Sequence, residues 1–355
     1  MLPFMSSDGS LEGMPVSLSD VAHAVGVSRA TASKALNGRR DVSATTRAKV
    51  LAAAKGLGYE RIGSVSKASY PVIALVADDF IGSYAVDILR GAATSALTAG
   101  VALVTLYTPA NPPPGVRVPL TDEWFDMVKM QNWLGVIVVT SRLSARQLNK
   151  VSTIDLPLVA IDPANALPPH VASIGATNWN GGVEATQHLL DLGHKRIAFI
   201  RGTTGSVPSA ERMQGYLSAL GMRGMAPDTR LIVGDDFSHA AGRRAAHELL
   251  ELPRTKRPTA IFASSDSLAL GVYEAAYARG FSIPKDLSVV GFDDSMIAEI
   301  TTPGLTTVRQ PLEDMGAAAV RYLVDVSKGR TTTSGPLRLA TQLVIRASTA
   351  PPPGL

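Results

Sequence analysis

The sequence predicts a small helical domain at the N-terminus, followed by a much larger α/β core with parallel sheets. Two patterns support this prediction. Apolar residues recur at helical spacing between residues 18 and 57, and beyond residue 70 short apolar runs of strand length alternate with helical segments. A chain of 355 residues also exceeds what one hydrophobic core usually serves, so we expect two or three compact units.

Three short helices are expected in the N-terminal part, over residues 18–25, 29–36 and 44–57. They are separated by residues that favour helix starts and helix ends: Gly26, Ser28, Asn37, Gly38, Ser43 and Gly58. The buried stripe of the third helix is expected to include Val50, Ala54 and Leu57. Such spacing fits a compact three-helix domain.

The core shows apolar runs bounded by turn residues, as expected for buried parallel strands. The runs cover residues 72–77, 101–106, 135–139, 157–161, 196–200, 259–263 and 287–292. Helices are expected between them, for example over residues 180–192, 241–252 and 268–278. Because more than 270 residues are too many for one sheet of this kind, we expect two similar α/β lobes.

The positive charge of the chain is confined to its N-terminal part. Residues 15–70 contain nine Lys or Arg against three acidic residues, a net charge of +6, whereas residues 71–355 carry equal numbers of both. This asymmetry suggests a polyanionic partner. A solvated basic face is the alternative that charge alone leaves open.

Several function classes are not expected. The chain has no cysteine, and it shows no GxxxxGK, HExxH or GxSxG motif and no metal-ligand spacing among its six histidines. We therefore expect no enzyme, no metal and no cofactor. The N-terminus resembles no signal peptide and no run is long enough to span a membrane, so a cytoplasmic location and no membrane partner are expected. Residues 1–14 and 347–355 are expected to be mobile.

Residues 16–59, VSLSDVAHAVGVSRATASKALNGRRDVSATTRAKVLAAAKGLGY, resemble the DNA-binding domain of the lactose-repressor (LacI/GalR) family. Later motifs resemble the two-lobed core of that family, which it shares with periplasmic sugar-binding proteins. They are HLLDLGHKRIAFI from His188, SAERMQGY from Ser209, SSDSLALGVYEAA from Ser264, DLSVVGFDDS from Asp286 and GLTTVRQPLEDMG from Gly304, the last expected to cross between lobes.

The resemblance implies an N-terminal three-helix helix-turn-helix domain (residues 15–60), a hinge linker (61–71) and a two-lobed periplasmic-binding-protein-like core with parallel sheets (72–346). Lobe 1 is expected to comprise residues 72–173 and 311–335. Lobe 2 is expected to comprise residues 174–308 and 336–346. A dimerising regulator of this kind should bind operator DNA and a small effector.

The resemblance implies that the second helix enters the major groove, where base edges can be distinguished. Arg29 and Lys34 are expected to read bases, whereas Ala30 can at most contact a thymine methyl group. The full set of expected DNA contacts is Ser17, Leu18, Ser28, Arg29, Ala30, Thr31, Ser33, Lys34, Asn37, Ser43 and Thr46. The hydroxyl and amide groups among them should hold phosphates. For Ser28 and Ser43, simple helix capping is the alternative.

The linker departs from the family pattern. The usual Pro-Asn-x-x-Ala-x-x-Leu hinge is replaced by Arg61, Ile62, Val65 and Ala68. An alanine cannot unstack a base step as the family's leucine does. Either Val65 or Ile62 substitutes for that leucine, or this protein bends its operator less.

The expected effector site is the cleft at the carboxyl ends of the strands. By motif position the resemblance nominates Asp79, Tyr84, Thr140, Asp162, Arg212, Phe237, Ser265, Asp266, Asp293 and Gln310. Paired charged groups and aromatic side chains suit a polyhydroxylated ligand, so a sugar is favoured. Two alternatives stay open: Asp162 could cap a helix, and Phe237 could belong to the core. One position also departs from the family pattern, because Ser265 precedes Asp266 where the family commonly has an asparagine.

The sequence therefore predicts a transcriptional repressor that binds a palindromic operator as a homodimer and is controlled by a sugar. One alternative is a regulator of the same fold with a purine or sugar-phosphate corepressor. A sugar-binding protein without DNA function is the other. No heptad pattern of leucines follows residue 346, which argues against a helix-bundle tetramer.

Overall fold

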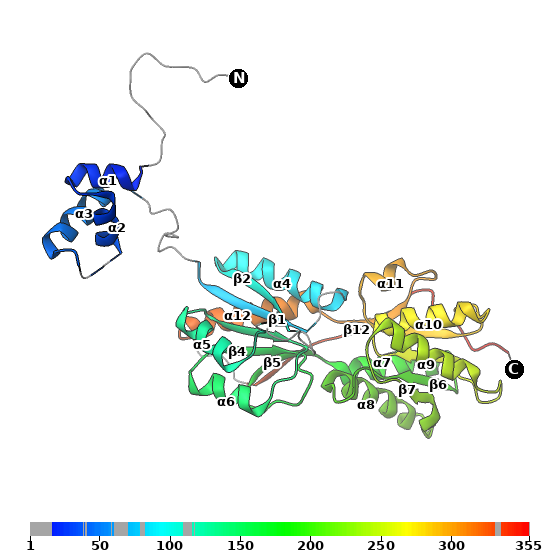
Figure 1. The fold of residues 1–355 in the computed structure, drawn as a ribbon. Coiled ribbons are helices and arrows are strands. Elements are labelled where there is room, and N and C mark those ends of the chain that lie inside the picture. Colours follow the sequence, from blue (N-terminus) through cyan, green and yellow to red (C-terminus); the bar gives the residue numbers. More distant parts are fainter. Residues whose placement is uncertain are drawn as a thin grey trace, which may run out of the picture. The chain divides into compact units, whose positions relative to one another are not determined.

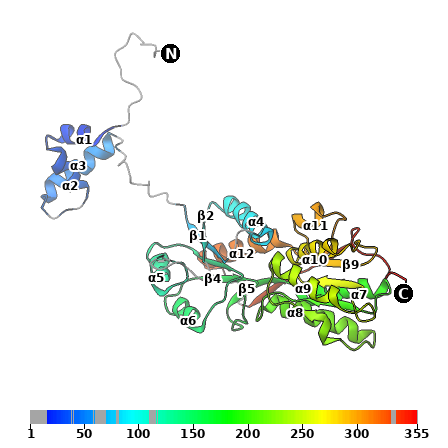
Figure 2. The same ribbon diagram turned by 45° about the vertical axis from the view of Figure 1, so that its right-hand side comes forward.

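The computed structural model describes residues 16–37, 39, 41–57, 59, 70–78, 82–108, 116, 118–330 and 335–354. The chain divides between Tyr70 and Pro71 into two compact units (Figures 1 and 2). The expected N-terminal extension, residues 1–14, and all of the hinge linker except its last two residues lie outside the described part of the chain. No helix in the described part is long and apolar enough to cross a membrane.

The first unit contains the three helices that the sequence predicts: α1 (Leu18–Val25), α2 (Arg29–Leu36) and α3 (Ala44–Gly56). Their starts are fixed by side-chain caps, in which the hydroxyls of Ser17, Ser28 and Ser43 each accept from a backbone N–H three residues later. Gly26 ends α1 in the left-handed conformation, with φ of 67°. Short polar signals therefore determine the helix boundaries.

Small apolar side chains form the core of the first unit, which lets its three helices pack closely. The fully buried members are Val21, Ala22, Ala32, Ala35, Val42, Val50 and Ala54. Leu57, expected in the buried stripe, is instead 42% exposed because α3 ends one residue before it. The core thus depends on α1, α2 and the first three turns of α3.

The first lobe of the second unit is built on a six-stranded sheet in the order β11-β5-β4-β3-β1-β2, in which all neighbouring strands are parallel. Its strands are β1 (Val72–Ala77), β2 (Ala102–Tyr107), β3 (Gly135–Val139), β4 (Leu158–Ile161), β5 (Ala172–Ala176) and β11 (Pro336–Leu339). Its helices are α4 (Ser83–Ala99), α5 (Asp122–Met130), α6 (Ala145–Thr153) and α12 (Leu312–Ser327).

Both faces of this sheet are buried. On β1, Ile73 and Leu75 pack with α4 and α12, whereas Ala74 and Val76 pack with α5 and α6. Because side chains alternate along a strand, a strand covered on both faces must be apolar throughout. This explains why the central strands were visible as continuous apolar runs in the sequence.

The second lobe repeats this arrangement. Its sheet has the order β12-β10-β9-β8-β6-β7, with β12 antiparallel to β10 and the other pairs parallel. The strands are β6 (Ile197–Ile200), β7 (Ile232–Val233), β8 (Ala260–Ala263), β9 (Ser288–Asp293), β10 (Thr306–Arg309) and β12 (Gln342–Val344). The helices are α7 (Asn178–Asp191), α8 (Val207–Met222), the 3₁₀ helix η1 (Thr229–Leu231), α9 (His239–Glu251), α10 (Asp266–Ala278) and α11 (Met296–Ile300).

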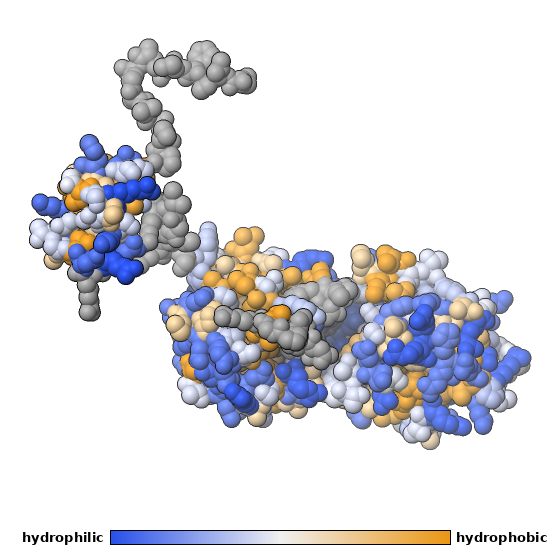
Figure 3. Space-filling view, viewed as in Figure 1, coloured by the Kyte–Doolittle hydropathy of each residue, from blue (hydrophilic) through white to orange (hydrophobic). Residues whose placement is uncertain are grey.

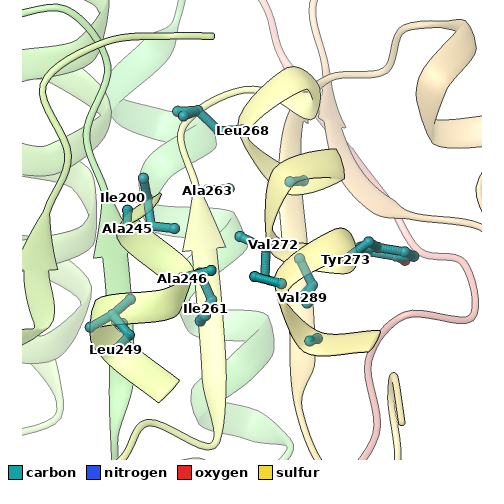
Figure 4. Close-up of a cluster of buried hydrophobic side chains, with 14 of the residues drawn as sticks. Ile200, Ala245, Ala246, Leu249, Ile261, Ala263, Leu268, Val272, Tyr273 and Val289 are labelled. Atoms are coloured by element: carbon teal, nitrogen blue, oxygen red, sulfur yellow. The ribbon is translucent and has the colours of Figure 1, made fainter. Parts of the chain in front are cut away.

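Helices α9 and α10 cover one face of this sheet, and Figure 4 shows their core. Ile261 and Val289 of the sheet pack there against Leu249 of α9 and Val272 of α10. The opposite face is covered by α7 and α8, with Phe199, Tyr216 and Phe262 buried between. Each lobe therefore has its own two cores.

Glycines allow the paired helices to touch backbone to backbone. In α7 and α8, a side chain at Gly182 would lie 2.4 Å from the carbonyl oxygen of Arg212, and one at Gly215 would lie 2.3 Å from that of Trp179. Similar reciprocal contacts join α4 to α12 and α9 to α10, at Gly91, Gly316, Gly242 and Gly271. Larger residues cannot be accommodated at these contacts, so the close packing of each pair depends on its glycines.

Segments between β5 and α7, between β10 and α12, and between β11 and β12 connect the lobes. The second of these confirms the crossover expected in GLTTVRQPLEDMG. The lobe boundaries need correction, because β5 continues to Ala176 and residues 336–339 pair with β5 in the first sheet rather than joining lobe 2. Strand β11 is largely exposed, so it lacks the apolar run that would have located it.

The expected mobile tail, residues 347–355, is ordered through Gly354 in the second lobe, so that prediction was wrong for this part. Ser348 is fully buried, donates from Oγ to the carbonyl of Val289 at 2.6 Å and accepts from the backbone N–H of Thr306 at 2.7 Å. Residues 348–350 add hydrogen bonds along β9 and β10, which the composition of the tail did not reveal.

Candidate functional site

The exposed face of α2 carries the residues expected to read bases. Arg29, Ala30 and Lys34 are exposed, whereas Thr31 and Ser33 are half-buried. Arg29 has no hydrogen-bond or ion-pair partner among the described residues. Its guanidinium is therefore available for an external acceptor, and a planar fork of donors suits a guanine edge or a phosphate.

The hydroxyl groups expected to hold phosphates are engaged in helix capping. Ser28 Oγ accepts from the N–H of Thr31 at 3.1 Å, and Ser43 Oγ accepts from that of Thr46 at the same distance. Ser17 forms a capping box with Asp20. A phosphate oxygen accepts, so it would need the hydroxyl hydrogen that Ser17 donates to Asp20 and that Ser43 donates to Thr46, and these contacts do not demonstrate a phosphate contact.

One feature of this surface was not expected from the sequence. Lys34 Nζ lies 2.7 Å from Asp41 Oδ2 across a surface hollow, and both side chains are about half exposed. The hydrogen bond from Lys34 lowers the pKa of Asp41. Asn37 likewise uses its amide to donate to the carbonyl of Ser33 at 2.8 Å. The ion pair between Lys34 and Asp41 spans the loop between α2 and α3. The conformation of that loop could not be predicted from the sequence.

In the two-lobed unit, three residues at strand ends have left-handed backbone conformations. Thr140 follows β3 with φ of 53°, Asp162 follows β4 with φ of 41°, and Asp293 ends β9 with φ of 118°. Such conformations cost about 1 to 3 kcal/mol each and cluster at functional sites. Motif position nominates the same three residues, and backbone strain of this kind is typical of functional sites.

On the first lobe, the half-buried Tyr84 and the buried Asp162 form a pair. The phenol of Tyr84, near the start of α4, donates to Asp162 Oδ2 at 2.6 Å. Burial raises the pKa of Asp162, although the hydrogen bond from Tyr84 and the charges of Arg212 and Arg338 oppose the shift. Burial and the neighbouring Asp162 carboxylate raise the pKa of Tyr84 well above its usual value. Asp162 accepts from Tyr84, and within the described part of the chain its side chain has no helix-capping hydrogen bond.

On the second lobe, Arg212 of α8 is buried at the centre of a hydrogen-bonded group. Its Nε donates to Asn178 Oδ1 at 2.8 Å, and its Nη1 donates to the carbonyl of Ser264 at 2.6 Å. Nη1 also lies 3.6 Å from Asp293 Oδ1, and the guanidinium stacks on the ring of Phe292 at 3.8 Å. These contacts fix the guanidinium plane and leave the second terminal nitrogen, Nη2, for other acceptors.

Gln310 completes this group. Its Nε2 donates to Asp293 Oδ1 at 2.7 Å, and its Oε1 is a buried oxygen without a hydrogen-bond partner among the described residues. Burial raises the pKa of Asp293 to about 6, with Arg212 and Gln310 opposing the shift. A buried acceptor without a donor is costly, so Gln310 is a suitable contact for a hydroxyl or amino group of a ligand.

Asp266 lies nearby, but its carboxylate is occupied. Oδ2 accepts from the N–H and hydroxyl of Ser295 at 2.7 and 2.9 Å, and Oδ1 accepts from Thr307 at 2.6 Å. Ser265 caps α10 through the N–H of Leu268. Burial and the repulsion of Asp293 raise the pKa of Asp266 to about 8. The structure thus places Ser265 and Asp266 in supporting contacts beside the Arg212 group.

The remaining nominated residues are more dispersed. Phe237 is half-buried with its ring over Gly202, and it packs on the core of the second lobe, which is the alternative that the sequence left open. Thr140 donates its hydroxyl to Asp78. Asp79 lies outside the described residues. No group of three histidine or acidic side chains suited to a metal occurs in the described part of the chain.

Sequence reasoning missed Asn178, Arg338 and Asp78. Asn178 follows the short strand β5, whose small residues gave no clear apolar run. Arg338 lies on the exposed strand β11, yet its charge acts on Asp162. Gly175 allows this approach, because a side chain there would lie 2.6 Å from Asp162 Oδ1 and 3.3 Å from Arg338 Nη1. Only the pairing of distant strands brings these groups together.

Comparisons with known proteins cover both units. The model of the lacI family of bacterial regulatory proteins matches residues 17–61, and that of the periplasmic binding protein-like domain matches residues 186–349. The HTH-type transcriptional regulator DegA of Bacillus subtilis is 31% identical, covering 95% of this chain and 99% of that protein.

Solved structures are similar over the same length. The complex of the transcriptional regulator CelR with cellobiose is 32% identical with a TM-score of 0.70, covering 94% of this chain and 99% of CelR. The lac repressor dimer bound to operator and the anti-inducer ONPF is 26% identical with a TM-score of 0.71, covering 95% and 100% of the two chains. The relatives are transcriptional regulators, and their fold agrees with the architecture described above.

Proposed function

The chain belongs to the LacI family of bacterial transcriptional regulators, and on that premise we propose that it is a repressor whose homodimer binds a palindromic operator and responds to a neutral sugar held between its lobes. The buried group around Arg212, Asp293 and Gln310 is the observation that carries the effector part of this proposal. The exposed face of α2 carries the operator part.

Operator recognition is supported by the position of the basic residues. The N-terminal part has a net charge of +6, which favours the phosphate backbone, and α2 exposes Arg29 and Lys34. Phosphate contacts position a protein on DNA, whereas contacts to base edges specify sequence. We assign the base contacts to Arg29 and Lys34 and the backbone contacts to the hydroxyl and amide groups around them.

A sugar effector is supported by the hydrogen-bonding capacity of the buried group. Arg212 Nη2 can donate, Gln310 Oε1 can accept, and Asp293 is held by both residues. Tyr84 and Asp162 supply a phenol and a carboxylate from the other lobe. A sugar hydroxyl both donates and accepts, so it can satisfy such mixed partners at once. The relative CelR was solved with cellobiose.

Charge argues against the anionic corepressors that are the alternative. Asp162, Asp266 and Asp293 are all buried near Arg212, and the pKa of each carboxyl is raised. Asp266, with a pKa of about 8, is largely protonated at neutral pH, but a phosphate would still face the ionised carboxylate of Asp293 in a low-dielectric region. A neutral ligand avoids this repulsion, so we favour a sugar over a purine nucleotide or a sugar phosphate.

Dimerisation is supported by exposed apolar side chains on two helices of the second unit. Val86 and Leu97 of α4 are 39% and 82% exposed, and Met296 and Ile300 of α11 are 67% and 68% exposed. Figure 3 shows apolar surface over α4 and over α11. Large apolar patches commonly mark interfaces, and a two-fold dimer matches a palindromic operator. The lac repressor relative was solved as a dimer on its operator.

The experiment that tests the proposal starts by selecting an operator from random duplexes with the full-length protein. Its affinity is then measured by fluorescence anisotropy with and without neutral mono- and disaccharides, cellobiose first. We expect a palindromic site and at least a tenfold loss of operator affinity with one sugar. R212A should lose that response and R230A, which alters an exposed ion pair, should keep it.

Four results would contradict specific parts of the proposal. A non-palindromic selected site would contradict operator binding as a homodimer. A monomer in analytical ultracentrifugation at micromolar concentration would also contradict it. A response to phosphorylated but not to neutral sugars would reverse the choice of effector. Tighter operator binding with the sugar would make it a corepressor rather than an inducer.

A further inference from the structure

Asn178 is buried directly after the first crossover, and it binds Arg212 rather than the end of its own helix. Its Oδ1 accepts from Arg212 Nε at 2.8 Å, and its Nδ2 donates to the carbonyl of Ala176 and to Glu211 Oε2, both at 3.2 Å. Only 2% of Asn178 is exposed. Because no side chain caps the start of α7, helix formation does not account for this amide.

The adjoining residue joins two crossovers. Thr177 Oγ1 accepts from the N–H of Thr341 at 2.9 Å, and the N–H of Thr177 donates to the carbonyl of Leu339 at 2.9 Å. Thr177 belongs to the first crossover and Thr341 to the third. Asn178 is therefore one residue away from the point at which these two segments are hydrogen-bonded to each other.

The other member of the charged pair is connected to the remaining crossover. Gln310, which follows β10 on the second crossover, donates to Asp293 at 2.7 Å, and Asp293 lies 3.6 Å from Arg212. The Arg212–Asp293 pair is thus connected through Asn178 on one side and Gln310 on the other to segments that link the lobes. A change at the pair must alter these contacts or be absorbed by them.

Helix packing limits how such a change can be absorbed. Gly182 and Gly215 let α7 and α8 meet backbone to backbone, and both helices lie side by side in Figures 1 and 2. A contact of this kind resists sliding, because any displacement produces a void or an overlap. Movement of Arg212 on α8 is therefore transmitted to the start of α7 rather than lost within the lobe.

From these contacts we infer that Asn178 is a positioning residue that couples occupancy of the interlobe site to the angle between the lobes. This inference rests on the proposed function, since it assigns a regulatory role within the same site. Asn178 Oδ1 orients Arg212 toward the ligand, and Asn178 Nδ2 ties that orientation to Ala176 and the first crossover. Ligand binding and lobe angle then share one hydrogen-bonded side chain, as a coupling between two sites requires.

Two substitutions separate the two halves of this role. N178D keeps an oxygen for Arg212 but loses the donor to Ala176 and Glu211. N178A loses both contacts. T186V is the matched control, because Thr186 is a fully buried residue of the same helix whose hydroxyl donates to the carbonyl of Gly182 and does not contact Arg212. If N178A does not fold, T186V is compared with N178D and with the double variant N178D/E211Q. The double variant also removes the neighbouring carboxylate charge.

Hydrogen exchange of the ligand-free protein gives the first readout. We expect N178D and N178A to speed exchange at least fivefold in peptides containing Thr177 and Thr341, with T186V unchanged there. Equal exchange in all variants would overturn the inference. This result does not require a ligand, so it stands even if no sugar acts on the wild-type protein, an outcome that would instead contradict the proposed function.

The second readout uses cellobiose, or the sugar to which the wild-type protein responds in the operator assay. We expect N178D to bind it within threefold of wild type, while the change in operator affinity caused by the sugar falls at least tenfold. N178A should lose both sugar affinity and response. If N178D retains the full response, Asn178 only orients Arg212 and the coupling role is wrong.

Discussion

Lys34 and Asp41 form an ion pair with 2.7 Å between Nζ and Oδ2, on the surface that is otherwise the most basic part of the chain. A carboxylate there is unfavourable for DNA binding, because it repels phosphates. Asp41 offsets this cost because its ion pair restrains Lys34, a flexible side chain that is expected to face base edges. Exposed pairs contribute little to stability, so we look for its effect in DNA binding rather than in folding.

The first prediction concerns D41N. Removing this carboxylate frees the Lys34 ammonium for phosphates, so affinity for non-operator DNA should rise several-fold. The dependence of log affinity on log salt should steepen by about 1. The ratio of operator to non-operator affinity should fall. Anisotropy titrations at several salt concentrations on both DNAs measure all three quantities.

The control for D41N is a double-mutant cycle with K34Q. If Asp41 acts through Lys34, then D41N has little additional effect once the lysine is gone. D20N removes a negative charge from the same domain at the capping box of α1, away from that pair. Asp41 would contribute only diffuse charge if two results were found together. D41N and D20N would raise non-operator affinity equally, and D41N would raise it by the same factor in the K34Q background.

A second prediction concerns R29A. Arg29 is exposed at the start of α2 and has no partner within the described residues, so its removal should not destabilise the fold. If it reads a guanine, R29A loses about 1 to 3 kcal/mol of discrimination at one base pair in each half-site. Binding measured on operators substituted at each position would locate that base pair. Equal losses on operator and random DNA would reject base reading.

Much of the fold could be predicted from apolar runs, because the central strands are covered on both faces. Strands without such runs were not found. Residues 172–176, ASIGA, form β5 mainly from small side chains. Strand β11 is an exposed edge strand whose residues are expected from the sequence in the second lobe but pair with β5 in the first. The prolines of the tail suggest no partner and so predict mobility, whereas the backbone and hydroxyl groups before them pair with the second sheet.

The candidate site was only partly predictable for a similar reason. Motif position located Arg212 and Asp293, and the structure brings them within 3.6 Å of each other. Motif position could not show that Asp266 is enclosed by Ser295 and Thr307. It also could not find Asn178, because its contact with Arg212 depends on how α7 packs against α8. Hydrogen bonds made across separate elements have no local signal in the sequence.

A third prediction concerns pH. Burial raises the pKa of Asp293 from the ordinary 3.8 to about 6, so the folded protein binds this proton more tightly than the unfolded chain does. Stability from this group is then fully present below about pH 4 and is lost as pH rises through about 6. The unfolding free energy of wild type minus that of D293N should therefore fall by an amount on the order of 3 kcal/mol over this pH interval.

Urea titrations at half-unit steps from pH 4 to pH 8 provide this measurement. D314N is the control, since Asp314 is an exposed carboxylate of α12, and its difference from wild type should not follow the same curve. Burial and the repulsion of Asp293 raise the pKa of Asp266 to about 8, so D293N should also shift that later loss toward lower pH. A difference curve for D293N that rises between pH 4 and 6 would mean that Asp293 is stabilised in its charged form.

The last prediction concerns the C-terminal segment. Ser348 Oγ lies between two buried backbone groups, donating to the carbonyl of Val289 and accepting from the N–H of Thr306. S348A leaves both without a partner, and an unsatisfied buried group costs about 1 to 3 kcal/mol. We therefore expect the free energy of unfolding to fall by about 2 kcal/mol, measured by urea denaturation. T98A removes an exposed hydroxyl that donates within α4 and should stay within about 0.5 kcal/mol of wild type. If the segment were mobile in solution, S348A would behave like T98A, because water rather than Ser348 would then satisfy the polar groups of Val289 and Thr306.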